Sequence, residues 1–191
     1  MVGIDISQEA IDFCMENYAL PHVEFKRMDF RKMVFENDSF DCVVSFETLE
    51  HIVEQEKFLQ EVKRILRPGG LFLVSTPDKD HYCKGFNESE SNPFHKKEFS
   101  RREFETLLKQ HFRVDRMYGQ VTAPHSENVV SPSCNEPQFK IYLRQVVVQN
   151  SILYKLFVIF SGKKKRYSPR PLDGRSGSVY LIGVCVNGVV T

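Results

Sequence analysis

Residues 40–75 have the sequence FDCVVSFETLEHIVEQEKFLQEVKRILRPGGLFLVS, which predicts a strand, a helix and a second strand. Residues 40–45 and 71–75 are runs of apolar and β-branched residues, as in strands that are buried on both faces. Between them, apolar residues recur at helical spacing at Phe58, Leu59, Val62, Ile65 and Leu66. The Pro-Gly-Gly sequence at 68–70 then predicts the helix end and a tight turn. Such a unit favours an α/β domain with a largely parallel sheet.

The residues before this unit continue the alternation of strands and helices. Residues 2–5 predict a short strand that ends in Asp5, and Ser7 has the position of a helix N-cap. Residues 23–26 alternate as the next strand. The helix between these strands is expected to bury one apolar face, formed by Ile11, Cys14, Met15 and Tyr18.

After the unit, a second helix start is well marked. Ser100 and Glu103 form a capping box, and Phe99 and Phe104 flank it as a hydrophobic staple. A strand is expected to begin near residue 112. The chain therefore carries at least two helices whose first turns are specified locally.

The chain divides into three regions by composition. Residues 1–120 form the expected α/β core. Residues 121–175 contain a loop rich in Pro, Ser and Asn, followed by an apolar helix over 139–154. The tract 139–160 is a candidate substrate lid, and core packing is the alternative. Residues 176–191 predict a C-terminal strand, near 179–186, that returns to the sheet.

Length and charge limit the classes of function. The chain has 191 residues, 41% of them hydrophobic and 27% charged, which excludes a disordered or fibrous protein. The formal net charge is +1, so no overall basic field attracts nucleic acid, and we expect no nucleic-acid partner. Five cysteines without a C-x-x-C pair indicate free thiols in a reducing compartment.

Membrane and targeting signals are weak. The N-terminal sequence has neither a basic nor an apolar region of a signal peptide. The most apolar tract, residues 152–160, is far shorter than the roughly 20 residues that span a bilayer. We therefore predict a cytoplasmic protein without a transmembrane segment. Peripheral contact with a membrane remains open, because the basic residues 163–166 lie beside that tract.

Polar and aromatic residues stand where the predicted strands end. Asp5 and Ile6 follow the first strand, Asp29 and Phe30 follow the second, and Ser45 is followed by Phe46. Ligands of open α/β sheets bind beyond the carboxyl ends of the strands, where an acid accepts hydrogen bonds from ribose hydroxyls. Asp5 suits that role, and Asp29 suits an adenine amine. The alternative is that both acids are solvated turn residues.

Glu47, Glu50 and His51 form the second candidate constellation. On a helix, this spacing of three and four residues places their side chains on one face. Two carboxylates and an imidazole are a candidate metal site, and the oxygen ligands favour Mg²⁺. The alternatives are a helix start without metal, or a histidine that only bonds its neighbouring carboxylates. Because imidazoles exchange protons near neutral pH, His51 and His95 are candidate general bases.

Four segments, VGIDISQEAI, FKRMDF, ENDSFDCVVSFETLEHI and EVKRILRPGGLFLVSTPD, resemble consecutive parts of class I S-adenosylmethionine-dependent methyltransferases. The resemblance runs from residue 2 to about residue 118 and is closest to small-molecule, glycan-cluster and ubiquinone-pathway enzymes. It implies a Rossmann-like, seven-stranded α/β sheet with helices on both faces. It also implies methyl transfer to an oxygen or nitrogen atom of a small molecule or of a glycan or lipid precursor.

The same resemblance implies roles for the strand-end residues. Asp5 would hold the cofactor ribose and Ile6 would pack on the adenine, whose edge Asp29 and Phe30 would contact. Ser45 and Phe46 would line the methionine and substrate end. Residues 92–95 resemble a stretch that borders the substrate pocket. Ubiquinone-pathway relatives have a similar E-x-x-E-H pattern that is linked to metal.

One departure from the family concerns its central strand and glycine-rich loop. The chain begins at the strand that follows them, and none of its ten glycines forms a G-x-G-x-x-G motif. The absent strand belongs between those at residues 2 and 40, so the resemblance implies an N-terminally truncated sheet. The expected activity is methyl transfer from S-adenosylmethionine. The alternative is a non-catalytic remnant, or a subunit that supports a partner.

Overall fold

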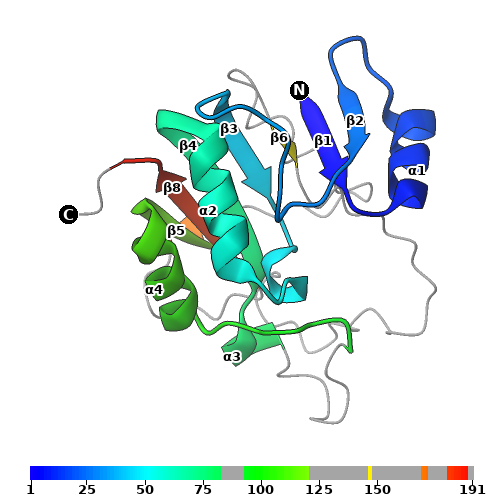
Figure 1. The fold of residues 1–191 in the computed structure, drawn as a ribbon. Helices are drawn as coiled ribbons and strands as arrows, with labels where there is room; N and C mark the ends of the chain where they lie inside the picture. The colour runs from blue at the N-terminus through cyan, green and yellow to red at the C-terminus, as the bar shows by residue number, and fades with distance from the viewer. Residues whose placement is uncertain (83–92, 121–145, 148–168, 172–179, 189–191) are drawn as a thin grey trace.

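A computed structural model describes residues 1–82, 93–120, 146–147, 169–171 and 180–188 (Figure 1). Within them, eight strands form one sheet in the order β2-β1-β6-β3-β4-β8-β5-β7. The strands are β1 Val2–Asp5, β2 Glu24–Arg27, β3 Phe40–Ser45, β4 Leu66–Pro77, β5 Arg113–Gln120, β6 Val146–Val147, β7 Pro169–Pro171 and β8 Tyr180–Val186. The helices are α1 Gln8–Tyr18, the 3₁₀ helix η1 Leu49–His51, α2 Gln55–Ile65, α3 Lys79–Tyr82 and α4 Arg101–His111.

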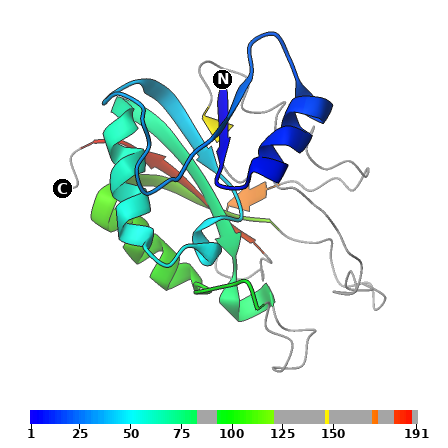
Figure 2. The same cartoon turned by 45° about the vertical axis from the view of Figure 1, so that its right-hand side comes forward.

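The direction of chain growth reverses in the middle of the sheet. β1 pairs in parallel with β2 on one side, and β3 pairs in parallel with β4 on the other. Parallel crossovers are almost always right-handed, so units that grow in opposite directions place their helices on opposite faces. Figure 2 shows α1 on one face and α2 with α4 on the other. The switch of direction lies between β1 and β3, which is where open α/β sheets bind ligands.

The two-residue strand β6 occupies this switch point. Val147 pairs with Val2 of β1 and Val43 of β3, and Val146 pairs with Gly3 and Val44, both antiparallel. The position is the one where the resemblance to methyltransferases places the family's central strand. β6 also falls within residues 139–154, predicted as a helix, and the other residues of that prediction lie outside the described part of the chain.

The core lies between the sheet and the helices α2 and α4. Four residues of the predicted stripe, Phe58, Leu59, Val62 and Ile65, are fully buried on α2 as expected. The fifth, Leu66, is also buried, but as the first residue of β4. The rings of Phe58 and Phe72 approach to 6.3 Å between centroids, and those of Phe72 and Phe112 to 5.2 Å. Each such side chain contributes about 1.5–3 kcal/mol through its removal from water.

The apolar face predicted for α1 is only half right. Ile11 and Cys14 are buried, but Met15 and Tyr18 are 55% and 42% exposed. The reason is the position of the helix, because it packs on β1 and β2, and β2 is the edge strand of the sheet that the described residues form.

The Pro-Gly-Gly sequence was expected to end α2 and to form the turn before the next strand. Instead α2 ends at Ile65, and residues 68–70 lie within β4, where Gly69 has a φ of +77°. The end of α2 is bound by Asn187, whose side-chain amide donates to the carbonyl oxygens of Lys63 and Leu66 at 3.1 and 2.6 Å. No local signal predicts a capping residue that lies so far along the chain.

Two local predictions about the helix starts are confirmed. The Ser7 hydroxyl accepts a hydrogen bond from the Ala10 amide at the start of α1. At α4, Ser100 and Glu103 form both bonds of the capping box. None of the helices in the described residues is long and apolar enough to span a bilayer. The described cysteines, Cys14, Cys42 and Cys185, are free and buried.

Candidate functional site

The loops that follow β1 and β2 lie side by side at one edge of the sheet. The Met28 amide donates to the Asp5 carbonyl at 2.9 Å, and the Arg27 guanidinium donates to the Ile6 carbonyl at 3.1 Å. These bonds follow from the parallel register, in which Asp5 is opposite Arg27. Asp5 and Asp29 therefore leave the sheet at the same edge.

At this edge Asp5 is half-buried and Ile6 is exposed. One Asp5 oxygen, Oδ1, accepts a hydrogen bond from the Ser7 amide at 2.8 Å, which fixes the carboxylate at the start of α1. Ile6 is 55% exposed, which is unusual for a large apolar side chain beside a partly buried acid. A carboxylate can accept hydrogen bonds from the hydroxyl groups of a sugar, and an apolar side chain beside it can pack on a flat ring attached to that sugar.

Asp29 and Phe30 are engaged within the protein. The Asp29 carboxylate accepts hydrogen bonds from Arg31 Nε and from the Arg31 amide, and these bonds lower the pKa of Asp29. Arg31 also pairs with Glu54 at 3.3 Å. Phe30 packs edge-on against Phe58, with 5.6 Å between ring centroids. Contact of Asp29 with an adenine amine would therefore compete with Arg31.

At the end of β3, the Ser45 side chain has an unsatisfied hydroxyl group. Its hydroxyl oxygen is buried and has no hydrogen-bond partner in the described part of the chain. Burial of an unpaired hydroxyl costs about 1–3 kcal/mol. The next residue, Phe46, accepts a hydrogen bond from the Thr48 hydroxyl through its carbonyl oxygen.

The expectation that Glu47, Glu50 and His51 share one α-helical face is wrong. Glu47 has a φ of +50°, and the helical turn η1 begins only at Leu49. The backbone leaves β3 sharply because the Glu47 amide bonds to the Ser75 carbonyl, and the Ser75 hydroxyl donates to the Glu47 carboxylate at 2.6 Å. Burial, and then the charge of Glu50, raise the pKa of Glu47.

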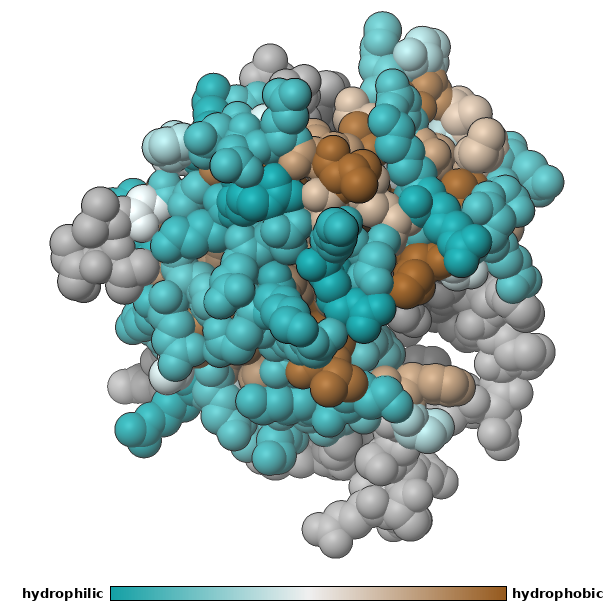
Figure 3. All heavy atoms as spheres, in the orientation of Figure 1, coloured by the Kyte–Doolittle hydropathy of each residue, from teal (hydrophilic) through white to brown (hydrophobic). Residues whose placement is uncertain are grey.

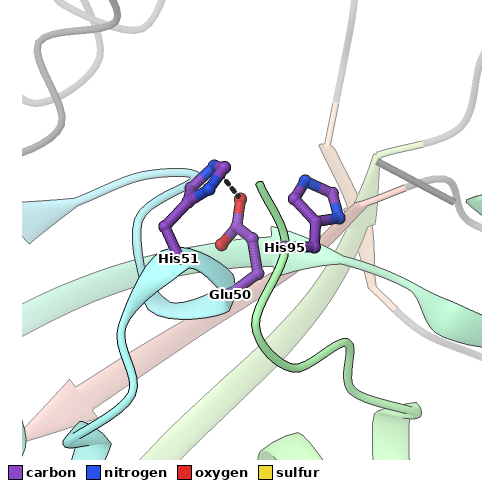
Figure 4. A group of neighbouring side chains, drawn as sticks. All are labelled: Glu50, His51 and His95. Atoms are coloured by element: carbon purple, nitrogen blue, oxygen red, sulfur yellow. Dashed lines mark ion pairs between the residues drawn. The ribbon is translucent and has the colours of Figure 1, made fainter. Parts of the chain in front are cut away.

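The structure brings together a different trio, Glu50, His51 and His95. Each offers one potential ligand atom, and these atoms all lie within 4.8 Å of one another. Figure 4 shows the Glu50 carboxylate between the two imidazole rings, with His95 contributed by a separate segment. His51 Nε2 lies 3.6 Å from Glu50 Oε1, and the side chain of Glu50 is only 1% exposed. The ring centroids of the two histidines are 5.0 Å apart.

Backbone bonds hold the His95 segment over Glu50. The amides of Lys96 and Lys97 both donate to the Glu50 carbonyl, at 2.7 and 3.1 Å. At the end of β4, the Lys79 amide bonds to the Phe99 carbonyl, which fixes the other end of the segment. The sequence predicts His51 and His95 as separate candidates and carries no signal that joins them, because the contact spans more than 40 residues.

Two further residues of the site were not predicted. Glu98 Oε1 lies 2.9 Å from His95 Nδ1 and orients that ring. Ser75 holds Glu47 as described above. Both are polar residues near a strand end or a helix start, a pattern too common to single out without a structure.

Among the described residues, the surface near the site has no large hydrophobic patch on the face shown in Figure 3. In Figure 3 the face that carries α2 and α4 is mostly hydrophilic, and its hydrophobic residues form separate small patches. One hollow of about 340 Å³ lies elsewhere, between α1 and β2, where it is lined by Met15, Ala19, Val23 and Phe25 among others. That hollow is at the amino end of β2 and is not the candidate site.

Part of the chain is similar to known methyltransferases. Residues 1–74 match the family described as a methyltransferase domain. A probable S-adenosylmethionine-dependent methyltransferase of Mycolicibacterium smegmatis is 33% identical over 108 residues, which are 56% of this chain and 41% of the relative. The phthiotriol/phenolphthiotriol dimycocerosates methyltransferase of Mycobacterium tuberculosis is 39% identical over 70 residues, 37% of this chain and 26% of the relative. The chain thus matches less than half the length of these relatives.

Solved structures agree at the level of the fold. A methyltransferase from Thermotoga maritima superposes with a TM-score of 0.66 at 14% identity, covering 97% of this chain and 72% of the other. One from Archaeoglobus fulgidus superposes with a TM-score of 0.60 at 14% identity, covering 97% and 75%. The fold is therefore α/β and Rossmann-like. In sequence over residues 1–74, and in fold, the chain is therefore similar to S-adenosylmethionine-dependent methyltransferases.

Proposed function

We propose that the protein transfers a methyl group from S-adenosylmethionine to an oxygen or nitrogen atom of a small molecule or of a lipid or glycan precursor. The observation that carries the proposal is the exposed edge at Asp5 and Ile6, beside the switch point of a sheet with the methyltransferase fold. When bound, the cofactor supplies a methyl group on a positively charged sulfur, which is already a strong electrophile.

The residues at the edge fit an adenosyl group at two points. The Asp5 carboxylate, held by the Ser7 amide through one oxygen, is placed to accept hydrogen bonds from ribose hydroxyls. Ile6 offers an exposed apolar surface to the adenine ring. The unpaired Ser45 hydroxyl, at the end of β3, offers a hydrogen bond to the methionine part or to the acceptor, with Phe46 beside it. Asp29 and Phe30 would take part only after Arg31 releases the acid.

The residues of the chain must also orient the acceptor and remove its proton. His51 and His95 are the proposed proton acceptors. A backbone carbonyl can only accept, so the contact of His51 Nδ1 with the Phe94 carbonyl at 3.0 Å places a proton on Nδ1. In neutral His51 the lone pair is then on Nε2. The contact of His95 Nδ1 with Glu98 favours the same tautomer in His95.

The acceptor class rests on the relatives. One of them is named for the methylation of phthiotriol and phenolphthiotriol dimycocerosates, which supports a lipid-type acceptor. The predicted lid at residues 121–175 lies mainly outside the described residues, and its role in acceptor choice is part of this proposal. A cytoplasmic location and the lack of a nucleic-acid partner stay predictions from the composition.

Calorimetric titration with S-adenosylhomocysteine tests the cofactor site. We expect the wild type to bind, and Asp5→Ala to bind about 10–100-fold more weakly, as expected for lost hydrogen bonds to a charged group. Asp12→Ala is the matched control, because Asp12 is an exposed acid of α1 that bonds only to Gln8 in the described residues. A folded wild type without binding would favour the alternative of a non-catalytic subunit. Equal affinity of the two variants would remove Asp5 from the site.

Transfer of a radiolabelled methyl group tests the proton step. We expect a lipid extract to accept label from the wild type. His51→Ala and His95→Ala should lower the rate at least tenfold while binding of S-adenosylhomocysteine is unchanged, since neither residue holds the cofactor. Unchanged transfer in both variants would exclude the imidazoles as bases.

A further inference from the structure

We propose that Glu50, His51 and His95 bind a divalent transition-metal ion of the Zn²⁺ class. The proposal differs from the magnesium site expected from the sequence in both ligands and metal. His95 takes the place that was predicted for Glu47, whose carboxylate accepts a hydrogen bond from Ser75.

The composition of the trio selects the ion. Two imidazole nitrogens and one carboxylate oxygen suit Zn²⁺, Co²⁺, Ni²⁺ or Fe²⁺, whereas Mg²⁺ prefers oxygen ligands and keeps much of its water. Three protein ligands are also the number found where a metal keeps an open position for water or a substrate.

The distances are compatible with such a site. Tetrahedral ligands at bond lengths of about 2.0–2.1 Å lie about 3.3 Å from one another. His51 Nε2 and Glu50 Oε1 are already 3.6 Å apart, and no pair of the three ligand atoms exceeds 4.8 Å. A contraction of up to about 1.5 Å, achieved by side-chain rotation, would complete the geometry.

The surroundings of the two imidazoles are the second observation that favours a metal. Metal-binding histidines almost always donate their other ring N–H to a carbonyl or carboxylate, which orients the ring. Here His51 Nδ1 contacts the Phe94 carbonyl at 3.0 Å and His95 Nδ1 contacts the Glu98 carboxylate at 2.9 Å. Both rings therefore have a partner of the expected kind on the atom that would not bind the metal.

The carboxylate is also placed for a cation. Glu50 is 1% exposed, and a buried carboxylate is stabilised by hydrogen-bond donors and positive charge beside it. Thr76 Oγ1 lies 3.5 Å from Glu50 Oε2, at the limit of a hydrogen bond. The alternative to a metal ion is a proton on His51 Nε2, which would make His51 an imidazolium paired with Glu50.

An open metal position at this place would face the methyl acceptor, and that part of the inference rests on the proposed function. A bound ion would occupy the Nε2 atoms that we propose as proton acceptors. A hydroxyl group on the ion would instead lose its proton more readily, because the metal charge stabilises the alkoxide. Metal binding itself is independent of methyl transfer.

The test is a titration of the metal-free protein with Co²⁺, followed by its visible absorption, with Zn²⁺ added as competitor. We expect one ion per chain, a tetrahedral or five-coordinate spectrum, and displacement by Zn²⁺. Glu50→Gln, His51→Ala and His95→Ala should each weaken binding at least 100-fold. The matched control is His111→Ala, because His111 is also a partly buried imidazole that bonds to a glutamate, Glu56. It should bind as the wild type does.

Glu98→Gln gives a variant that keeps all three ligands. Because it weakens the acceptor on His95 Nδ1, it should lower the affinity for Co²⁺ by about 10–100-fold. Thermal unfolding of each apo-variant shows that the fold is retained. Binding that persists in Glu50→Gln and His95→Ala, or no Co²⁺ spectrum in the wild type, would overturn the inference. Co²⁺ binding without S-adenosylhomocysteine binding would overturn the proposed function alone, and the reverse result would overturn the metal site alone.

Discussion

At the scale of single residues, Arg64 connects α2 to the segment that precedes β3. Its guanidinium donates to the carbonyl oxygens of Met33 and Phe35, both at 2.7 Å. It also pairs with Glu61, one turn earlier on α2, and Glu61 in turn accepts a hydrogen bond from the Met33 amide at 2.9 Å. The Arg64 bonds lower the pKa of Glu61 below its ordinary value.

Glu61→Gln should therefore reduce stability in a pH-dependent manner. Since the folded-state pKa is the lower one, the ionised carboxylate contributes stability at neutral pH, and this contribution is lost as the pH falls through the folded-state pKa. We expect urea unfolding to show a loss of about 1–2 kcal/mol near neutral pH that shrinks as the solution is made acidic. Glu16→Gln, at an exposed position on α1, should change the free energy of unfolding by less than about 0.5 kcal/mol. A difference that is independent of pH would contradict the assignment.

At the scale of secondary-structure elements, the start of α4 is specified by its own sequence. The Ser100 hydroxyl lies 3.4 Å from the Glu103 amide, and the Glu103 carboxylate accepts from the Ser100 amide at 2.8 Å. We expect Ser100→Ala to lower the free energy of unfolding by about 1 kcal/mol. Gln110→Ala on the exposed side of α4 is the control, with little change. The double variant Ser100→Ala/Glu103→Ala should lose less than the sum of the single variants, and strict additivity would show that the two bonds are independent.

The elements that the sequence predicts well are those with local causes. The stripe Phe58, Leu59, Val62 and Ile65 repeats along one helix, so its spacing is enough to place it against the sheet. The failures have non-local causes. The exposure of Met15 depends on α1 lying at the end of the sheet, and the turn at Glu47 depends on Ser75 of a neighbouring strand.

The same distinction applies to the candidate site. Asp5 and Asp29 could be placed at one sheet edge from the sequence, because parallel strands that follow one another end together. The trio of Glu50, His51 and His95 could not, since the segment that carries His95 is held by backbone bonds to the Glu50 carbonyl. The hydrogen-bond contact of Glu98 with His95 can be recognised only from the position of the His95 ring in the structure.

At the scale of the whole molecule, the sheet consists of two parts that meet at β6. Among the described residues, β1 is hydrogen-bonded only to β2 and β6, and β6 is the element that links β1 to β3. The proposed cofactor edge at Asp5 belongs to one part, and Ser45 with the histidine pair belongs to the other. Within the sheet, β6 is the described strand that joins the two parts, while contacts such as Phe30 with Phe58 and Arg31 with Glu54 join them outside the sheet.

Replacement of Val146 and Val147 by proline tests the contribution of β6, because proline removes both backbone N–H donors of β6. A cost of about 3 kcal/mol would raise the exchange rate of the β1 amides roughly 100-fold, if those amides exchange through separation of β1 from β6. The amides of β8, which pairs with β4 and β5, should remain protected. Threonine at both positions keeps the N–H groups and the β-branched shape, so this control should exchange as the wild type does. Hydrogen exchange measured by NMR distinguishes the cases, and unchanged protection of residues 2–5 in the proline variant would show that another contact holds the two parts together.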